Sequence, residues 1–265
     1  MPYRVDLRKV GDAALDRLVE LGALDVELSG QGGLAALMPD SVAPEHVSGA
    51  LGINVEDMSV TPAVGRDAGS VWVLSPRPIS IGRLRIVPAH TEAPDALKLL
   101  DGAAFGTGLH PTTALCLEAL EEIVGIARPD AVLDVGTGSG VLALAALMMG
   151  VPRALAIDID DEALRVASEN ARINAIDDRL QLMCGGPEVV TGMWPLVLAN
   201  VLPGALIEMA PALVRRVGHR GQLVLSGIPS SVDRDVDQAY QRLGMRRVRA
   251  TSRTGWIALV MQASW

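Results

Sequence analysis

The glycine-rich segment DVGTGSG at residues 134–140 is the feature that most constrains how this chain can fold. It follows the apolar run at 131–135 and leads into a second apolar run at 140–149. This order predicts a buried parallel strand, a tight turn and a helix that returns over the sheet. Gly136 and Gly138 lack the side chains that would keep a ligand away from the backbone. The segment therefore predicts a pocket at the carboxyl edge of a parallel sheet.

The next predicted strand, ALAIDID at 154–160, carries Asp158 at its end. A carboxylate at this place can accept hydrogen bonds from both ribose hydroxyls of a nucleoside. A dinucleotide fingerprint would have glycine at Val141, and Asp134 puts negative charge where a pyrophosphate would lie. S-adenosylmethionine, which has no phosphate, suits the pocket better. On the motif alone a plain strand-to-helix turn is an equal alternative, and Asp158 favours the cofactor. The candidate cofactor-binding residues here are Asp134, Gly136, Gly138 and Asp158.

Strands and helices alternate from residue 112 onward, which predicts an α/β fold with a doubly wound, Rossmann-like parallel sheet. The predicted helices are 112–125, 140–149, 161–174, 204–216 and 231–243, and the strands are 131–135, 154–158, 180–184, 195–200 and 222–227. The last two runs, RRVRATSR and GWIALVMQA, predict an antiparallel hairpin at the sheet edge.

The first 88 residues predict a small α+β domain. Strands at 3–7, 25–29, 33–38 and 55–61 and helices at 12–21 and 44–51 have the β-α-β-β-α-β order of a ferredoxin-like fold. The proline-marked stretch from Thr61 to Pro94 holds strand-like VWVL and RLRIV, and we interpret it as a hinge or bridging segment. We predict a ferredoxin-like domain at 1–88, a linker and hinge at 89–102, and an S-adenosylmethionine-binding α/β domain at 103–265.

Two further segments carry polar groups that suit chemistry. AFGTGLHPTT at 104–113 could fold over a cofactor as a lid, or it could be a helix N-cap with a solvent-facing His110, and the residues favour the two equally. NVLP at 200–203 follows an apolar strand, so Asn200 is predicted to point into the pocket and accept hydrogen bonds from a substrate amine. The alternative is that Asn200 only caps the next helix.

The composition limits the classes of function. The chain has 265 residues, a net charge of −8 and a pI near 5.0, which disfavours nonspecific nucleic-acid binding and favours a basic partner. No apolar run reaches the roughly 20 residues of a membrane span, and the first residues lack a signal-peptide pattern. Cys116 and Cys184 predict buried free thiols in a reducing cytoplasm. We expect a cytoplasmic monomer without a metal site.

Taken together, AFGTGLHPTT, DVGTGSG, AIDID, LANVLP, LSGI and GWIALV resemble, in order and spacing, the family of ribosomal protein L-eleven methyltransferases. The resemblance is close from about residue 80 to 262, and AFGTG-x-HPTT is its specific part. It implies S-adenosylmethionine as cofactor, with contacts from Thr113, Gly136, Asp158 and Asn200. It also implies that Phe105, Thr107 and Gly108 shape the pocket, and that a ferredoxin-like amino-terminal domain recognises the protein substrate.

The departures from the family pattern lie where the substrate is chosen. Trp72 is followed by Val73 and Leu74, where the family has two tryptophans and a lysine-rich stretch, and the proline expected before the lid is absent. The resemblance thus implies an enzyme that methylates lysine side chains or the terminal amine of a ribosomal protein, and the cofactor is the firmer part of that expectation.

Two alternatives remain open. One is a methyltransferase acting on a nucleic-acid base or a small amine, although Val201 and Leu202 provide no aromatic ring to stack a flipped base. Arg247, Arg249 and Arg253 would share one strand face and could touch RNA, but a solvated edge strand is the favoured interpretation. The other is a binding protein that keeps the fold without catalysis. His110 is a weak candidate for a general base.

Overall fold

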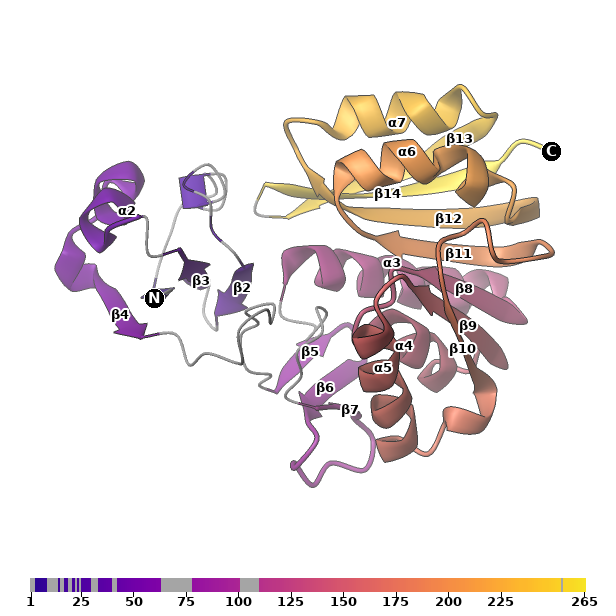
Figure 1. Ribbon diagram of the computed structural model, residues 1–265, viewed down its shortest axis with the longest axis horizontal. Coiled ribbons are helices and arrows are strands. Elements are labelled where there is room, and N and C mark those ends of the chain that lie inside the picture. Colours follow the sequence, from indigo (N-terminus) through magenta and orange to yellow (C-terminus); the bar gives the residue numbers. More distant parts are fainter. Residues whose placement is uncertain are drawn as a thin grey trace.

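The computed structural model describes residues 3–8, 14, 17–18, 21, 23, 25–29, 33–39, 42–62, 78–100, 110–253 and 255–265. They form a large sheet with helices on both faces and a small amino-terminal sheet to one side (Figure 1). The predicted class, a doubly wound α/β sheet with a small α+β unit, is confirmed. None of the described helices is long and apolar enough to cross a membrane.

The large sheet has seven strands in the order β10-β9-β8-β11-β12-β14-β13. Their bounds are β8 Ala131–Val135, β9 Arg153–Asp158, β10 Leu180–Cys184, β11 Trp194–Asn200, β12 Val217–Pro229, β13 Met245–Arg253 and β14 Trp256–Ala263. The pairs up to β12 are parallel, and β12–β14 and β13–β14 are antiparallel, so the closing hairpin is confirmed. Strand β12 is longer than the predicted 222–227, because it begins beside Trp194 before a register shift.

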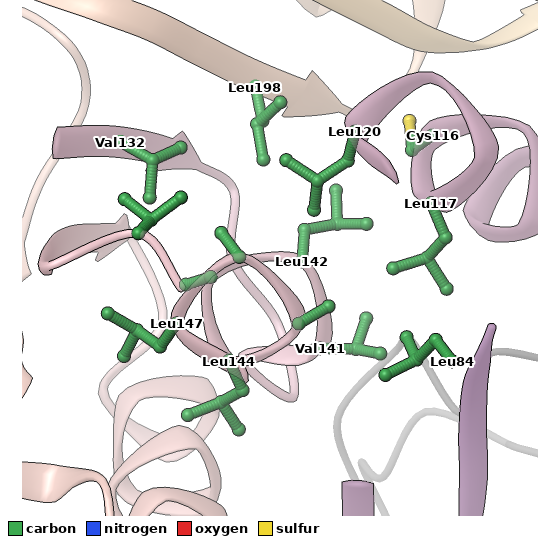
Figure 2. Packing of buried hydrophobic residues seen from close by; sticks show 14 of the residues in the cluster. Leu84, Cys116, Leu117, Leu120, Val132, Val141, Leu142, Leu144, Leu147 and Leu198 are labelled. Atoms are coloured by element: carbon green, nitrogen blue, oxygen red, sulfur yellow. The ribbon is translucent and has the colours of Figure 1, made fainter. Parts of the chain in front are cut away.

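Alternate residues of the parallel strands enter two separate cores, as the two-residue period of a strand requires. One core joins Val132, Leu196 and Leu198 to helices α3 and α4, and the other joins Leu133, Val197 and their neighbours to α6 and α7. The helices are α3 Pro111–Ala127, α4 Val141–Met148, α5 Asp161–Ile173, α6 Pro203–Val214 and α7 Asp233–Gln241. Helix α4 has the sequence VLALAALM and is apolar on all sides, which fits its position between α3, the sheet and a small sheet (Figure 2).

The small three-stranded sheet consists of β5 Ile79–Ile81, β6 Leu84–Pro88 and β7 Leu97–Leu99. Its apolar residues share the core of α3 and α4. Asn170 lies in α5 and accepts a 2.8 Å hydrogen bond from the backbone N–H of Leu100. Asn174, at the carboxyl end of the same helix, accepts a 2.8 Å hydrogen bond from the backbone N–H of Lys98. The described part of the segment proposed as a hinge is therefore attached to the body that carries the large sheet, while the domain boundaries themselves stay a prediction.

The amino-terminal sheet is antiparallel, with the order β2-β3-β1-β4 that a ferredoxin-like unit requires. Its elements are β1 Tyr3–Leu7, β2 Asp25–Ser29, β3 Gly33–Met38, helix α2 Pro44–Leu51 and β4 Met58–Pro62. Residues 55–57 form a short 3-10 helix, so the strand predicted at 55–61 begins three residues late. Most of the helix predicted at 12–21, and the VWVL segment with Trp72, lie outside the described residues.

Two sequence-based expectations about surface residues are wrong. A bulge between Arg247 and Arg249 turns these side chains to opposite faces of the sheet, where Arg247 pairs with Asp237 of α7. Arg249 and Arg253 instead pair with two glutamates of α3, Glu122 and Glu118. Cys116 is buried as expected, but Cys184 is exposed, because it ends a strand at the edge of the sheet.

Leu144 tests how strongly the α4 core supports the fold. Its side chain is fully buried among the residues of Figure 2, so Leu144→Ala removes apolar contacts and leaves a cavity. We expect the free energy of unfolding to fall by about 2–5 kcal/mol. Denaturant unfolding followed by circular dichroism measures it. Ile126→Ala, at a side chain that is 79% exposed, is the control and should change it by less than about 0.5 kcal/mol.

Candidate functional site

The glycine turn lies where β8 and β9 end. Gly136, Gly138 and Gly140 all have positive φ angles, of 70°, 56° and 84°, which side chains with a Cβ rarely adopt. The backbone N–H groups of Gly136 and Thr137 both donate to the carbonyl of Ile157, at 2.9 and 3.0 Å. These bonds tie the turn to the end of β9, so the predicted pairing of the two strand ends is correct.

Asp158 ends β9 beside this turn. One carboxylate oxygen accepts a hydrogen bond at 2.9 Å from the Gly138 N–H, and the other accepts one at 3.1 Å from the Asp160 N–H. Each oxygen has a second lone pair, and the side chain is only partly buried. A carboxylate held this way is oriented in advance and can still accept hydrogen bonds from a pair of ribose hydroxyls.

Asp134 lies beneath the turn and is 1% exposed. Its Oδ2 accepts a 2.6 Å hydrogen bond from the Thr137 hydroxyl and a 3.2 Å bond from the Ala143 N–H, and its Oδ1 is buried without a partner among the described residues. Burial raises the pKa of this carboxyl from an ordinary 3.8 to about 6. Asp134 thus supports the turn and, at neutral pH, puts a negative charge under it. Whether it also contacts the cofactor stays a prediction.

Asn200 ends β11, the strand next to β8 in the sheet. Its Nδ2 donates to the Thr113 hydroxyl at 3.4 Å, and its Oδ1 is buried with no hydrogen-bond partner in the described part of the chain. Thr113, in the first turn of α3, is itself fully buried. Because a buried acceptor without a partner is costly, this oxygen suits a site where a donor arrives with the ligand. The alternative in which Asn200 only caps a helix does not fit, because α6 begins without a side-chain cap.

The packing role of Val201 and Gly227 in the site was not predicted from the sequence. A Cβ atom at Gly136 would overlap the Val201 side chain, and one at Gly227 would overlap the Val201 carbonyl oxygen. Two glycines at different strand ends therefore allow the NVLP segment to approach the turn. The signal in the sequence was the glycine that follows the apolar run LVLS, which repeats the strand-then-glycine pattern of DVG.

His110 is only partly exposed. It caps α3, its Nδ1 accepting a hydrogen bond from the Thr112 N–H at 3.3 Å, and its ring lies edge-on to Trp256 with centroids 5.0 Å apart. Burial lowers the pKa of His110 to about 3, so the ring is neutral at physiological pH and is too weak a base to serve as a general base. Phe105, Thr107 and Gly108 lie outside the described residues.

The geometry fits S-adenosylmethionine. Asp158 can hold the ribose, the glycine turn lets the ligand approach the backbone without meeting side chains, and Asn200 has an acceptor at the adjoining strand end that no described residue engages. The negative charge of Asp134 beneath the turn favours a cationic group above it. A phosphate-bearing dinucleotide would meet two carboxylates in the same place.

Comparison with known proteins decides which family uses this arrangement. The family model of ribosomal protein L11 methyltransferase (PrmA) matches residues 50–264. The chain belongs to this family. The match starts about 30 residues earlier than the resemblance in the sequence indicated, so it includes β4 and the end of α2 from the amino-terminal unit. As a member of the PrmA family, the chain is an enzyme, an S-adenosylmethionine-dependent methyltransferase.

Individual relatives agree with the family assignment. A ribosomal protein L11 methyltransferase from Pelobacter propionicus is 38% identical over 83% of this chain and 73% of its own length. One from Geobacter sulfurreducens is 39% identical over 76% of this chain and 68% of its own length. The crystal structure of a ribosomal protein L11 methylase from Lactobacillus delbrueckii subsp. bulgaricus has a TM-score of 0.66 at 32% identity, covering 71% of this chain and 99% of that one.

Asp158→Ala tests the ribose assignment. The variant removes a charged acceptor, so we expect the dissociation constant for S-adenosylmethionine to rise about tenfold or more, measured by titration calorimetry. Asp130→Ala is the matched control, since Asp130 precedes β8 at the opposite edge of the sheet and is largely exposed. Unchanged affinity in a folded Asp158→Ala protein would exclude the assignment.

Asp134→Asn tests the buried carboxyl. A folded-state pKa raised to about 6 means that the native protein binds this proton more tightly than the unfolded chain. The resulting stabilisation is fully present below about pH 4 and is lost as pH rises through 6, a change of about 3 kcal/mol. Relative to the variant, the native protein should lose that much unfolding free energy between pH 4 and 6 in urea titrations. Parallel stability curves for the two proteins would contradict the burial argument.

Proposed function

We propose that this chain transfers methyl groups from S-adenosylmethionine to amino groups of a ribosomal protein, on lysine side chains, the terminal amine or both. The observation that carries the proposal is the Oδ1 of Asn200 at the end of β11, next to the glycine turn, which is unpaired within the described residues. The family and the relatives described above, which are named for ribosomal protein L11, support the choice of substrate.

Asn200 is the residue we assign to the substrate amine. Its Nδ2 is engaged with Thr113, so Oδ1 is the atom left to accept an N–H of the incoming nitrogen. An amine held through its N–H keeps its lone pair in another direction, toward the methyl donor. The amide cannot remove the proton, because it is not a base, so Asn200 orients the nucleophile.

When bound, S-adenosylmethionine supplies a methyl group on a positively charged sulfur. Little covalent help is needed from the protein. Holding nitrogen, methyl and sulfur in line can contribute up to about 7–11 kcal/mol in favourable cases, because a bimolecular step becomes a local one. The glycine turn, Asp158 and Asn200 belong to three neighbouring strands of one sheet, which gives them the rigidity that this alignment requires.

The protonation state of the amine limits which amines react. At pH 7, removing the proton from a lysine of pKa about 10.4 costs roughly 4.6 kcal/mol, against about 1 kcal/mol for a terminal amine of pKa near 7.7. Terminal amines are the easier target. An apolar pocket would help lysine by lowering its pKa. The proton goes to solvent before binding, since His110 is too weak a base.

The remaining site and partner assignments are part of the same proposal. We assign Gly136 and Gly138 to the cofactor, Thr113 to the support of Asn200, and Phe105, Thr107 and Gly108 to a lid over the pocket. Residues 1–88 would recognise the substrate, 89–102 link the parts and 103–265 bind the cofactor. The net charge of −8 suits a basic ribosomal protein rather than RNA. A cytoplasmic monomer fits such a substrate.

The competing functions receive less support. A base methyltransferase would need a ring to stack the flipped base, and the loop after Asn200 presents Val201 and Leu202. The arginines of β13 that could have touched RNA are paired with carboxylates of α3 and α7. A binding protein without catalysis would not need a buried, unpaired Asn200 oxygen placed to accept a hydrogen bond from a substrate amine.

Asn200→Ala should lower turnover much more than cofactor affinity. Loss of the orienting acceptor misplaces the nucleophile, so we expect kcat to fall about 100-fold while the dissociation constant for S-adenosylmethionine changes less than about threefold. Radiometric methyl transfer and calorimetry measure the two. Gln262→Ala removes a comparable amide from the far end of β14 and should leave both unchanged. Full turnover in Asn200→Ala would remove this residue from the reaction.

Incubation with methyl-labelled cofactor, total ribosomal protein and ribosomal RNA identifies the substrate class. Label on one basic protein, located by mass spectrometry at amino groups, supports the proposal. Label on RNA would support the base methyltransferase, and cofactor binding without any transfer would support the binding protein.

A further inference from the structure

Trp256 joins the amino-terminal unit to the pocket. It begins β14, where it pairs with Pro229 near the carboxyl end of β12, the edge that also carries Asn200. Its partly buried ring packs against the hydrophobic core of the amino-terminal sheet. The same ring meets the edge of His110 at a centroid distance of 5.0 Å and an interplanar angle of 69°. One side chain thus contacts both the amino-terminal unit and the start of α3.

From His110 a continuous set of contacts leads to Asn200. The neutral His110 ring accepts the Thr112 N–H and contacts the Thr112 hydroxyl at 2.7 Å, which sets the first turn of α3. The next residue, Thr113, accepts the 3.4 Å hydrogen bond from Asn200 Nδ2. Since that bond determines which way the amide faces, the position of the first turn of α3 determines where the Asn200 oxygen points.

The hairpin that carries Trp256 is attached to α3 at two more places. Arg253 pairs with Glu118 at 2.6 Å, and Arg249 pairs with Glu122, one helical turn further along. The carbonyl of Gly255 accepts hydrogen bonds from the N–H and hydroxyl of Ser230. Trp256 is therefore held on a rigid support, so its ring can transmit the position of the amino-terminal unit to α3.

We infer that Trp256 is a positioning residue for methyl transfer: contact of the amino-terminal unit with its ring sets His110 and the first turn of α3, and thereby the Asn200 oxygen. The inference rests on the proposed role of Asn200. On this inference, the amino-terminal unit proposed to recognise the substrate also helps to align the substrate amine. The indole Nε1 is buried without a partner among the described residues, so the ring face and edge carry the effect, not its N–H group.

Trp256→Leu and Trp256→Phe separate the ring from simple apolar bulk. Leucine keeps apolar contact with the amino-terminal core but has no ring for His110, so we expect kcat to fall about tenfold or more with an unchanged dissociation constant for S-adenosylmethionine. Phenylalanine keeps a ring and should restore most of kcat. Trp194→Leu is the matched control. Trp194 is also partly buried, with an Nε1 that no described residue pairs, but it lies at the opposite end of β11. This control should reduce stability without lowering kcat in the folded protein.

A double-mutant cycle with His110→Asn tests the path itself. Asparagine keeps a helix-capping acceptor but has no ring, so the variant should lower kcat as Trp256→Leu does. If the two rings act through each other, the double variant falls no further than the lower single variant. Additive losses, an unchanged kcat in Trp256→Leu, or an equal loss in Trp194→Leu would each overturn the inference. An inert Asn200→Ala would instead overturn the proposed function.

Discussion

The close approach of four strand ends is the constraint on which the rest of this structure depends. Strands β9, β8, β11 and β12 are neighbours in the parallel part of the large sheet, and their loops meet at a single edge. Val201 lies between Gly136 and Gly227, where any Cβ would overlap its side chain or its carbonyl oxygen. Both glycines also have positive φ angles, so a larger residue at Gly136 or Gly227 would be disfavoured by its backbone conformation as well as by the lack of space.

The charges at this edge suit a cationic ligand. Asp158 is held by two backbone N–H groups, while Asp134 is buried below the turn with one oxygen that no described residue pairs. Burying a carboxylate in this way disfavours the free protein at neutral pH, and a positively charged sulfur above the turn would offset that cost. The negative charge that argues against a pyrophosphate thus becomes a reason for S-adenosylmethionine.

Much of the fold and the cofactor side of the site could be predicted from local patterns. The apolar run, the glycines and the acidic end of the next strand are adjacent in sequence, so Gly136, Gly138 and Asp158 could be grouped from the sequence alone. The bulge that sends Arg247 and Arg249 to opposite faces could not, because strand periodicity assumes a regular strand. The partial burial of His110 was missed for a related reason, since the ring that contacts it comes from residue 256.

By itself, the sequence determined the alternating α/β order, the glycine turn beside the acidic end of the next strand, and the family, since each depends on residues close together in the chain or on recurring spacing. Only the tertiary structure decided how distant residues act together. It placed Thr113 against Asn200, Val201 between two glycines, and Trp256 between the amino-terminal unit and His110. The physical reason is that hydrogen bonds, ring contacts and close packing depend on distances of a few ångströms, which no local pattern specifies for residues far apart in the chain.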